Sequence, residues 1–361
     1  MSRTALAILS TENLLHNINT IRSHAPHSKI VAMVKANGYG HGLRSSALKM
    51  QNYVDMLGVS SIDEALALRK VGIKIPILLA EGVFESRELV IASAEKFAVA
   101  FHNNAQLEWL RNTMLPQPLS GWLKINTGLG RLGFTLDEAQ TAYTLLHTST
   151  KIKPPLTMMS HFACADTPEN PLNKTQCDIF KKITVLMHGN YSICNSAALF
   201  AMPDMHYDYI RPGLALYGIS PFMGCSAASL NLKPVMTIRS TLIAINMLAK
   251  GSSVGYGARY TCSEQMPIGV VAFGYGDGYP ISARDGTPVL IQNTRCPLVG
   301  RISMDMLTVD LRTCPQAQIG DTVTLWGDEL PLEEVAVHTQ SIPWALLTSV
   351  QHRVQFLWTQ P

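Results

Sequence analysis

The stretch KIVAMVKANGYGHG, residues 29–42, predicts a buried strand followed by a glycine-rich loop. Its apolar residues 30–34 form a short continuous run, which is typical of a strand buried on both faces of a parallel sheet. Lys35 closes that run, and three glycines in the next residues, 38–42, let the backbone bend closely around a ligand. We therefore expect Lys35 at the carboxyl end of a strand, where solvent is scarce.

Similar apolar runs recur along the first two thirds of the chain, separated by amphipathic segments. The eight runs cover residues 29–34, 56–59, 75–79, 97–101, 122–125, 156–160, 191–194 and 209–216. The helix-like segments between them include residues 61–71, 85–94, 104–112, 136–146 and 174–187. Eight buried parallel strands with crossover helices predict an α/β fold, a (β/α)₈ TIM-type barrel, over residues 1–225.

The sequence changes in character after residue 225, where strand-like runs alternate with Gly, Pro and Asp turns. The runs cover residues 231–247, 268–273, 289–292, 306–311 and 322–325, and the main helical signal is at 333–340. They predict a mostly antiparallel β domain over residues 226–361. An additional strand at 4–9, followed by a helix capped by Ser10 or Thr11, could join either the barrel or this second domain.

The composition fits a chain with a large core and excludes several classes of protein. Of the 361 residues, 47% are hydrophobic and 15% are charged. The net charge is only +3 and no Lys/Arg run occurs, which argues against nucleic acid as a partner. No run of about 18 apolar residues predicts a membrane span. Seven widely spaced cysteines without a Cys-x-x-Cys pair favour a reduced, cytoplasmic protein without a metal site.

The position of Lys35 alone allows two interpretations. Desolvation disfavours the charged form of a lysine, so its amine can act as a nucleophile and form an imine with an aldehyde cofactor. Alternatively, a lysine at a strand end simply extends its amine to water. The Gly-Tyr-Gly-His-Gly sequence at 38–42 favours the first interpretation.

Residues 34–42 resemble the lysine signature of the bacterial alanine racemases, and further segments resemble that family in the same order. These segments are residues 124–133, 160–166, 194–198, 211–218, 254–260, 274–279 and 299–305. The resemblance implies a barrel followed by a β domain, pyridoxal 5′-phosphate (PLP) as cofactor and alanine as substrate. It also implies a homodimer with shared active sites that interconverts L- and D-alanine and so supplies D-alanine for peptidoglycan.

The resemblance also implies a role for each site residue. Lys35 would hold PLP and act as one base, and Tyr256 from the partner subunit would be the other. The cofactor-binding residues would be Lys35, Tyr39, His161, Asn195, Ser196, Arg211, Gly213 and Leu214. The substrate-binding residues would be Arg131, Tyr275 and Met304, and Lys124 would be a candidate for carbamylation, which in some members holds the arginine in place.

Within that set, the resemblance places Arg211 opposite the PLP ring nitrogen. It assigns the phosphate to the hydroxyls of Tyr39 and Ser196 and to the backbone amides of Gly213 and Leu214. Taken singly, these residues have simpler interpretations. Tyr256 could be a loop tyrosine packed on neighbouring glycines, Asn195 could be a helix N-cap, and Arg211 could be a salt-bridge residue.

Alternative functions and departures from the family pattern remain. A PLP barrel decarboxylase, a racemase of broader specificity and a non-catalytic PLP-binding protein use related chemistry. A metal-dependent hydrolase using His161 and Asp166 is disfavoured because no His-x-His pair ends the first strand. Gly38 and Gly276 stand where many relatives have Ala, and Gly255 stands where many have Ser. His352 occupies a position where some relatives have Tyr, and we assign it no role.

Overall fold

The computed structural model describes residues 4–360 of the chain. These residues divide into two compact units. One contains residues 17–216 and 221–223 and is called the barrel below. The other contains the chain up to His16, residues 217–220 and the chain from Gly224 onward, and is called the β domain. Each unit is described by itself.

The barrel is built on an eight-stranded sheet with strand order β8-β7-β6-β5-β4-β3-β2-β9. All of its strand pairs are parallel. The strands are β2 (Lys29–Met33), β3 (Met56–Val59), β4 (Ile77–Leu79), β5 (Ala98–Phe101), β6 (Leu119–Lys124), β7 (Ile152–Met159), β8 (Asn190–Ser192) and β9 (Tyr209–Ile210). The ends of the sheet meet where the Arg211 amide donates to the Cys194 carbonyl at 2.9 Å and the Ser192 hydroxyl donates to the Tyr209 carbonyl at 2.7 Å. The sheet is therefore a nearly closed parallel barrel.

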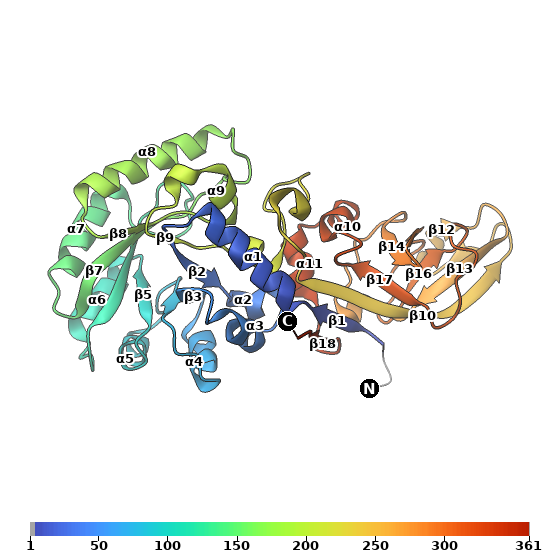
Figure 1. Cartoon of the computed structure of the whole chain (residues 1–361), viewed down its shortest axis with the longest axis horizontal. Helices are drawn as coiled ribbons and strands as arrows, with labels where there is room; N and C mark the ends of the chain where they lie inside the picture. The colour runs from blue at the N-terminus through green and yellow to red at the C-terminus, as the bar shows by residue number, and fades with distance from the viewer. Residues whose placement is uncertain (1–3, 361) are drawn as a thin grey trace. The chain divides into compact units, whose positions relative to one another are not determined.

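Helices alternate with these strands and lie outside them (Figure 1). They are α3 (Leu43–Met50), α4 (Ile62–Lys70), α5 (Ser86–Ala94), α6 (Asn104–Asn112), α7 (Leu136–His147), α8 (Pro171–Leu186) and α9 (Ser196–Ala201). Side-chain caps start several of them: Ser61 starts α4, Asn103 starts α6, and Thr135 starts α7 in a capping box with Glu138. The predicted fold class, a (β/α)₈ barrel followed by a mostly antiparallel β domain, is confirmed.

The interior of the barrel is filled with apolar side chains. A buried cluster joins residues of six strands and the residue after β4, namely Val31, Met33, Met56, Leu78, Ala80, Ala98, Ala100, Trp122 and Met159. The Trp122 ring lies against Tyr209 with 5.1 Å between ring centroids. In barrels of this kind the interior is a packed core, so chemistry is expected at the carboxyl ends of the strands.

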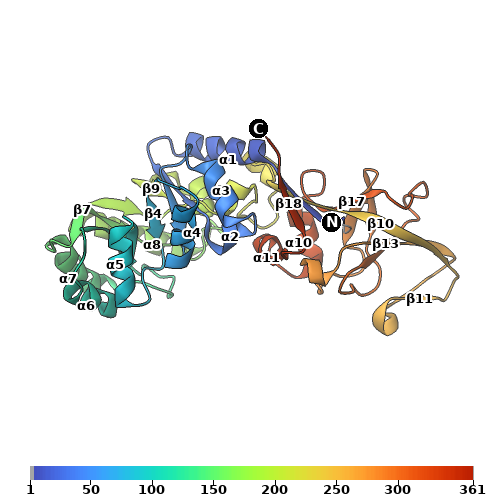
Figure 2. The same cartoon turned by 90° about the horizontal axis from the view of Figure 1, so that it is seen from below.

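The β domain is organised around the long strand β10 (Met236–Leu248), which pairs antiparallel with β1 (Leu6–Leu9), β13 (Met266–Val271) and β17 (Thr322–Trp326) (Figure 2). The sheet continues through β14 (Pro288–Ile291), β15 (Thr294–Pro297), β16 (Leu307–Asp310) and β18 (Gln355–Trp358). The strand near the N-terminus therefore belongs to this sheet, where it also pairs in parallel with β18. A short hairpin, β11 (Ser253–Val254) with β12 (Tyr260–Thr261), and the helices α10 (Leu332–Thr339) and α11 (Pro343–Ser349) complete the domain. Ser10 caps the first helix, α1 (Thr11–His24), because its hydroxyl accepts a bond from the Asn13 amide at 3.1 Å. From Asn17 onward this helix belongs to the barrel.

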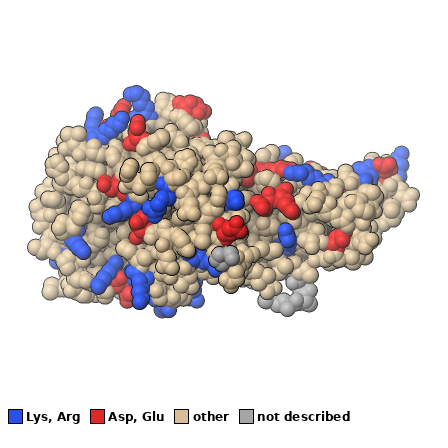
Figure 3. Space-filling model, viewed as in Figure 1, with Lys and Arg blue, Asp and Glu red and all other residues tan. Residues whose placement is uncertain are grey.

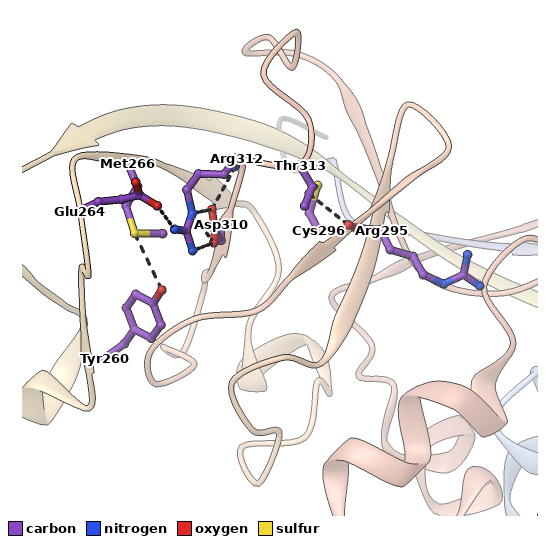
Figure 4. Close-up of polar contacts among 8 residues, drawn as sticks. All are labelled: Tyr260, Glu264, Met266, Arg295, Cys296, Asp310, Arg312 and Thr313. Carbon is purple, nitrogen blue, oxygen red and sulfur yellow. Dashed lines mark hydrogen bonds and ion pairs between the residues drawn. The ribbon is translucent and has the colours of Figure 1, made fainter. Parts of the chain in front are cut away.

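Ion pairs on the β domain are structural. Arg312 makes a forked contact with the nearly buried carboxylate of Asp310 and also contacts Glu264 (Figure 4).

Positive and negative side chains are interspersed on the face of the molecule drawn in Figure 3. Among residues 4–360, none of the helices combines the length and apolar character that crossing a membrane requires. The seven cysteines are all free thiols.

Candidate active site

Lys35 begins the short helical turn α2 (Lys35–Tyr39), directly after β2 at the carboxyl end of the barrel. This turn is left-handed, because Ala36, Asn37, Gly38 and Tyr39 all have φ between 51° and 62°. Such a conformation is costly for residues other than glycine and persists only where surrounding contacts fix it. Here the Ala36 amide donates to Glu64 Oε1 at 2.9 Å, and Asn37 Oδ1 accepts a bond from the Leu43 amide at 2.9 Å. The Lys35 backbone is thus held rigidly at the barrel mouth.

The Lys35 amine is less desolvated than its sequence position predicts. Its side chain is 34% exposed, and Nζ lies 3.4 Å from Glu81 Oε1. Glu81 follows β4 and was not among the residues predicted from sequence. The sequence signal that could have identified it is its position: an acidic residue two positions after the apolar run 75–79 and next to Gly82.

Tyr39, Ser196 and Gly213 converge on one small region at the barrel mouth. The Ser196 hydroxyl accepts bonds from the Gly213 amide at 2.9 Å and the Ala215 amide at 3.3 Å. A Cβ atom on Gly213 would overlap the Tyr39 hydroxyl, so only glycine fits there. Burial raises the pKa of Tyr39 to about 12, which keeps its hydroxyl protonated and able to donate. Leu214 begins the short 3-10 turn Leu214–Tyr217 that follows. Hydroxyls and backbone amides without bulk suit a phosphate group.

Asn195 has the structural role that its sequence allowed. It is the N-cap of α9, and its Oδ1 atom accepts a bond from the Ala198 amide at 2.9 Å. This cap fixes the position of Ser196, the first residue of the helix. Asn195 therefore orients the hydroxyl that faces Gly213.

Arg211 is buried at the end of β9 and contacts three groups from neighbouring strands. One guanidinium nitrogen donates to the Ser192 hydroxyl at 2.5 Å, and another donates to the Ser160 carbonyl and lies 3.3 Å from His161 Nδ1. Burial lowers the pKa of Arg211 to about 10, so it remains a cation at neutral pH. Burial and the neighbouring cations, Arg211 first, lower the pKa of His161 well below its usual value. His161 is therefore neutral beside a permanent cation.

Lys124 ends β6 and is buried, with its amine 3.5 Å from the Ala80 carbonyl. Burial, followed by repulsion from Arg211 and Arg131, lowers the pKa of Lys124 to about 8. Arg131 lies on the exposed loop after β6. Asn126 holds this loop, since its Oδ1 atom accepts bonds from the amides of Gly128 and Gly130 at 3.1 and 3.0 Å.

The remaining predicted site residues belong to the β domain and are exposed there. Tyr256 starts a one-turn 3-10 helix after β11 and is 71% exposed. Tyr275 and Met304 lie together, because the Tyr275 amide donates to the Ser303 carbonyl at 3.1 Å and the Gly276 amide donates to the Met304 carbonyl at 2.8 Å. The structure therefore groups the predicted residues into a barrel cluster and a β-domain cluster.

Arg353 supports the β-domain cluster. It donates to the fully buried carboxylate of Asp277 at 2.6 Å and to Asp305 at 2.5 Å. Asp277 in turn accepts a bond from the Gly274 amide at 2.8 Å. These charge-assisted bonds fix the loop that carries Tyr275.

The residues at the barrel mouth match the chemical groups of PLP. Lys35 offers a primary amine, the Tyr39, Ser196 and Gly213 region offers hydroxyls and a backbone amide for a phosphate, and Arg211 offers a cation without acceptor capacity. Lys124 and Arg131 add positive charge, which suits the anionic groups of the cofactor and of an amino acid. The residues fit the cofactor. Within residues 4–360, no group of three or more His, Cys, Asp and Glu side chains could hold a metal ion.

A parallel barrel with an amine and buried cations at its carboxyl mouth, joined in sequence to an antiparallel β domain, defines a class of barrel enzyme that acts on small anionic molecules. Two family models identify the class more narrowly. Residues 9–221 match the alanine racemase N-terminal domain, and residues 235–358 match the alanine racemase C-terminal domain. The chain belongs to the alanine racemase family.

Full-length relatives agree with this assignment. The chain is 45% identical over 351 residues to the alanine racemase of Aliivibrio salmonicida, covering 97% of this chain and 98% of the relative. It is 42% identical over 356 residues to that of Legionella pneumophila, covering 99% and 100%. By this homology the chain is an alanine racemase, an isomerase of class EC 5.1.1.1.

Solved structures of the family share the whole fold. The biosynthetic alanine racemase from Pseudomonas aeruginosa superposes with a TM-score of 0.97 at 37% identity, covering 99% of this chain and 100% of the other. The alanine racemase from Bartonella henselae, with covalently bound pyridoxal phosphate, gives a TM-score of 0.87 at 26% identity, with 99% of each chain covered.

Proposed function

We propose that this chain binds PLP covalently through Lys35 and interconverts L- and D-alanine with two bases, Lys35 and Tyr256 of a second copy of the chain. The observation that carries the proposal is the position of the Lys35 amine. It lies on a rigid turn at the barrel mouth. The buried Arg211 and the phosphate-binding cradle, our name for the region formed by Tyr39, Ser196 and Gly213, lie in the same unit.

Racemisation requires that the α-proton leave from one face of the substrate and return to the other. When bound, PLP supplies an electron sink for the pair left on the α-carbon. The free Lys35 amine accepts the proton on one face, or returns it in the reverse direction. Arg211 stays protonated and has no acceptor atom, so it leaves the cofactor's ring nitrogen without a proton. A weaker electron sink reduces side reactions at the cofactor.

Tyr256 is the proposed base on the opposite face. Its ring is exposed on a β-domain loop, as expected for a side chain that completes a site on another copy of the chain. A phenol with an ordinary pKa near 10 needs cationic surroundings to act as a base near neutral pH. We propose that Arg211 provides this positive charge, with the neutral His161 beside it, in a homodimer with shared active sites.

The remaining residues select and orient the substrate. Arg131 binds the substrate carboxylate, and Lys124, as a carbamate, holds that arginine in place. Tyr275 and Met304 are joined through their loops and restrict the space for the substrate side chain, which favours alanine over larger amino acids. A racemase of broader specificity and a decarboxylase are the alternatives.

The cellular role is proposed from the family. D-alanine made by this enzyme would supply peptidoglycan synthesis in the cytoplasm. The free state of all seven cysteines suits a reducing compartment.

The decisive experiment combines spectroscopy with a stereochemical assay. The purified chain with PLP should show the visible band of a lysine imine, and borohydride should fix the cofactor to Lys35, as peptide mapping would show. L-alanine should then be converted to a mixture of both enantiomers, L-serine more slowly, and no amine product should form. A colourless protein, or release of CO₂ and an amine, would contradict the proposal.

A further inference from the structure

Glu81 is a carboxylate at the barrel mouth to which no role has been assigned so far. It follows β4 and lies 3.4 Å from Lys35 Nζ, with its side chain 37% exposed. An isolated ion pair at this exposure contributes little to stability, so its existence alone proves nothing. Its backbone, however, is held far more tightly than an ordinary surface loop.

Two contacts fix the Glu81 backbone. The His102 Nε2 atom lies 3.0 Å from the Glu81 carbonyl oxygen. Gly82 has φ of +76°, and a Cβ atom there would overlap the Ala100 carbonyl and lie 2.5 Å from Gln106 Nε2. Gln106 also donates to the Val83 carbonyl at 2.9 Å. These contacts fix the backbone of residues 81–83. The position of the Glu81 carboxylate near Lys35 therefore follows from the fold.

The charges around Lys35 explain what a carboxylate does in this place. The surroundings of the Lys35 amine are mainly cationic or neutral. The titratable and charged groups on the neighbouring elements are Tyr39 on the same turn, Glu64 on α4, Glu81 after β4, His102 after β5, Lys124 and Arg131 at and after β6, His161 after β7 and Arg211 after β9. Of the two carboxylates, Glu64 is occupied by the backbone amides of Ala36 and Ser60. Glu81 is the one whose carboxylate contacts the Lys35 amine.

We propose that Glu81 is the positioning residue for Lys35: it holds the amine in place at the barrel mouth when the amine is not bonded to the cofactor, and it stabilises the ammonium form once the amine has taken up a proton. The inference rests on the proposed function of Lys35. In turnover, the proton that Lys35 takes from the substrate α-carbon stays on the Lys35 nitrogen. Glu81 stabilises the resulting ammonium by attraction and takes no proton itself. In the reverse direction the same ammonium returns its proton to the α-carbon.

The test measures how fast the Lys35 amine of the apoprotein forms its imine with PLP, as a function of pH. Only the neutral amine reacts, so the rate rises with pH to a plateau. Glu81→Gln removes the charge that favours the ammonium form. We expect the midpoint of its rate curve to fall by about half to one pH unit, which is about a threefold to tenfold faster reaction below the midpoint.

Three further measurements make the result specific. Glu81→Asp keeps the charge and should retain most of the wild-type midpoint, whereas Glu108→Gln, an exposed position on α6, should not move it. High salt screens an ion pair. Salt also screens the repulsion from Lys124, Arg131 and Arg211, which acts in both proteins, so high salt should reduce the difference between the wild-type and Glu81→Gln midpoints. If Glu81→Gln does not fold, Glu81→Ala takes its place in the same comparison.

The outcomes separate the two proposals. If the wild-type apoprotein forms no imine on Lys35, the proposed function is wrong and this inference fails with it. If the wild type reacts but Glu81→Gln follows the same pH curve at low salt, only the role of Glu81 is overturned.

Discussion

The barrel and the β domain carry their proposed site residues in opposite ways. In the barrel, Lys124, Ser196 and Arg211 are each about 5% exposed, and their polar atoms are bonded within the barrel itself. In the β domain, Tyr256 is 71% and Met304 is 54% exposed. The barrel residues are thus organised within one unit, whereas the β domain presents its proposed site residues at its surface.

The buried polar groups of the two units differ in the same sense. In the β domain they pair as opposite charges: Asp277 with Arg353, and Asp310 with Arg312 (Figure 4). In the barrel, Arg211 is buried against neutral oxygens and a neutral histidine, and Lys124 against a carbonyl. Leaving a charge without a counter-ion is costly. In the proposed function, anionic groups of the cofactor and substrate offset this cost at the barrel mouth.

The largest expected effect is in the barrel, on Lys35→Ala. Removing the amine removes both the covalent link to PLP and one base, so turnover should fall by on the order of a thousandfold or more in both directions. Polarimetry or chiral chromatography of alanine measures the rates. Lys70→Ala, an exposed lysine at the end of α4, is the matched control and should keep normal rates. Normal turnover by Lys35→Ala would remove the barrel site from the proposal.

The next effect tests the β domain through Tyr256→Phe. The exposed ring stays and only the hydroxyl is lost, so folding should be unchanged while kcat falls by about a hundredfold or more. Since L- and D-alanine are equally stable, kcat/KM must fall equally in both directions, and substrate deuterium isotope effects should change more in one direction than in the other. Tyr260→Phe is the control, because the Tyr260 hydroxyl donates to the Met266 Sδ atom of the same domain, 3.8 Å away (Figure 4). Equal activity of the two variants would contradict the two-base proposal.

The regular elements could be predicted because their signals are local. The α6 bounds, residues 104–112, and the β3 bounds, residues 56–59, coincide with the predicted ranges. Other elements depend on distant partners. Strand β18 was not predicted, because its partner β1 lies more than 300 residues earlier. The run at 209–216 gives a strand of only two residues, since the chain turns there to form the cradle around Gly213.

The site could be predicted as a set of residues but not as an arrangement. The glycines after Lys35 indicate a bend, yet nothing in the sequence states that Ala36, Asn37 and Tyr39 are left-handed as well. That conformation is imposed by bonds from other segments, such as the one to Glu64. Glu81 was missed for a similar reason: its importance comes from the distance to Lys35, which is 46 residues away in sequence.

A smaller effect concerns Lys124 and follows from its pKa. Carbamylation requires the neutral amine, and a pKa of about 8 makes that form scarce at pH 6.5 and predominant at pH 9. At a fixed concentration of dissolved CO₂, the carbamate should therefore increase by about tenfold or more across this range. Isotopically labelled CO₂ and NMR would detect the carbamate resonance, and Lys124→Gln should abolish it. If the protein gives the same spectrum as Lys124→Gln at every pH, Lys124 is not carbamylated and acts as a lysine.

The smallest effect distinguishes strain from crowding in the turn that positions Lys35. Gly38 has φ of +62°, and a Cβ atom there would lie 2.9 Å from the Ser46 hydroxyl. Gly72 is also left-handed, but a Cβ atom on it would meet nothing within 4 Å. Gly38→Ala and Gly72→Ala should each lower the free energy of unfolding by about 1 kcal/mol through backbone strain. Any excess in Gly38→Ala measures crowding against Ser46. Because the Ser46 hydroxyl is buried without a hydrogen-bond partner, Ser46→Ala should remove that excess in urea unfolding experiments. If the additional loss of unfolding free energy persists in the Gly38→Ala/Ser46→Ala variant, it comes from the turn that contains Gly38 and not from contact with the Ser46 hydroxyl on α3.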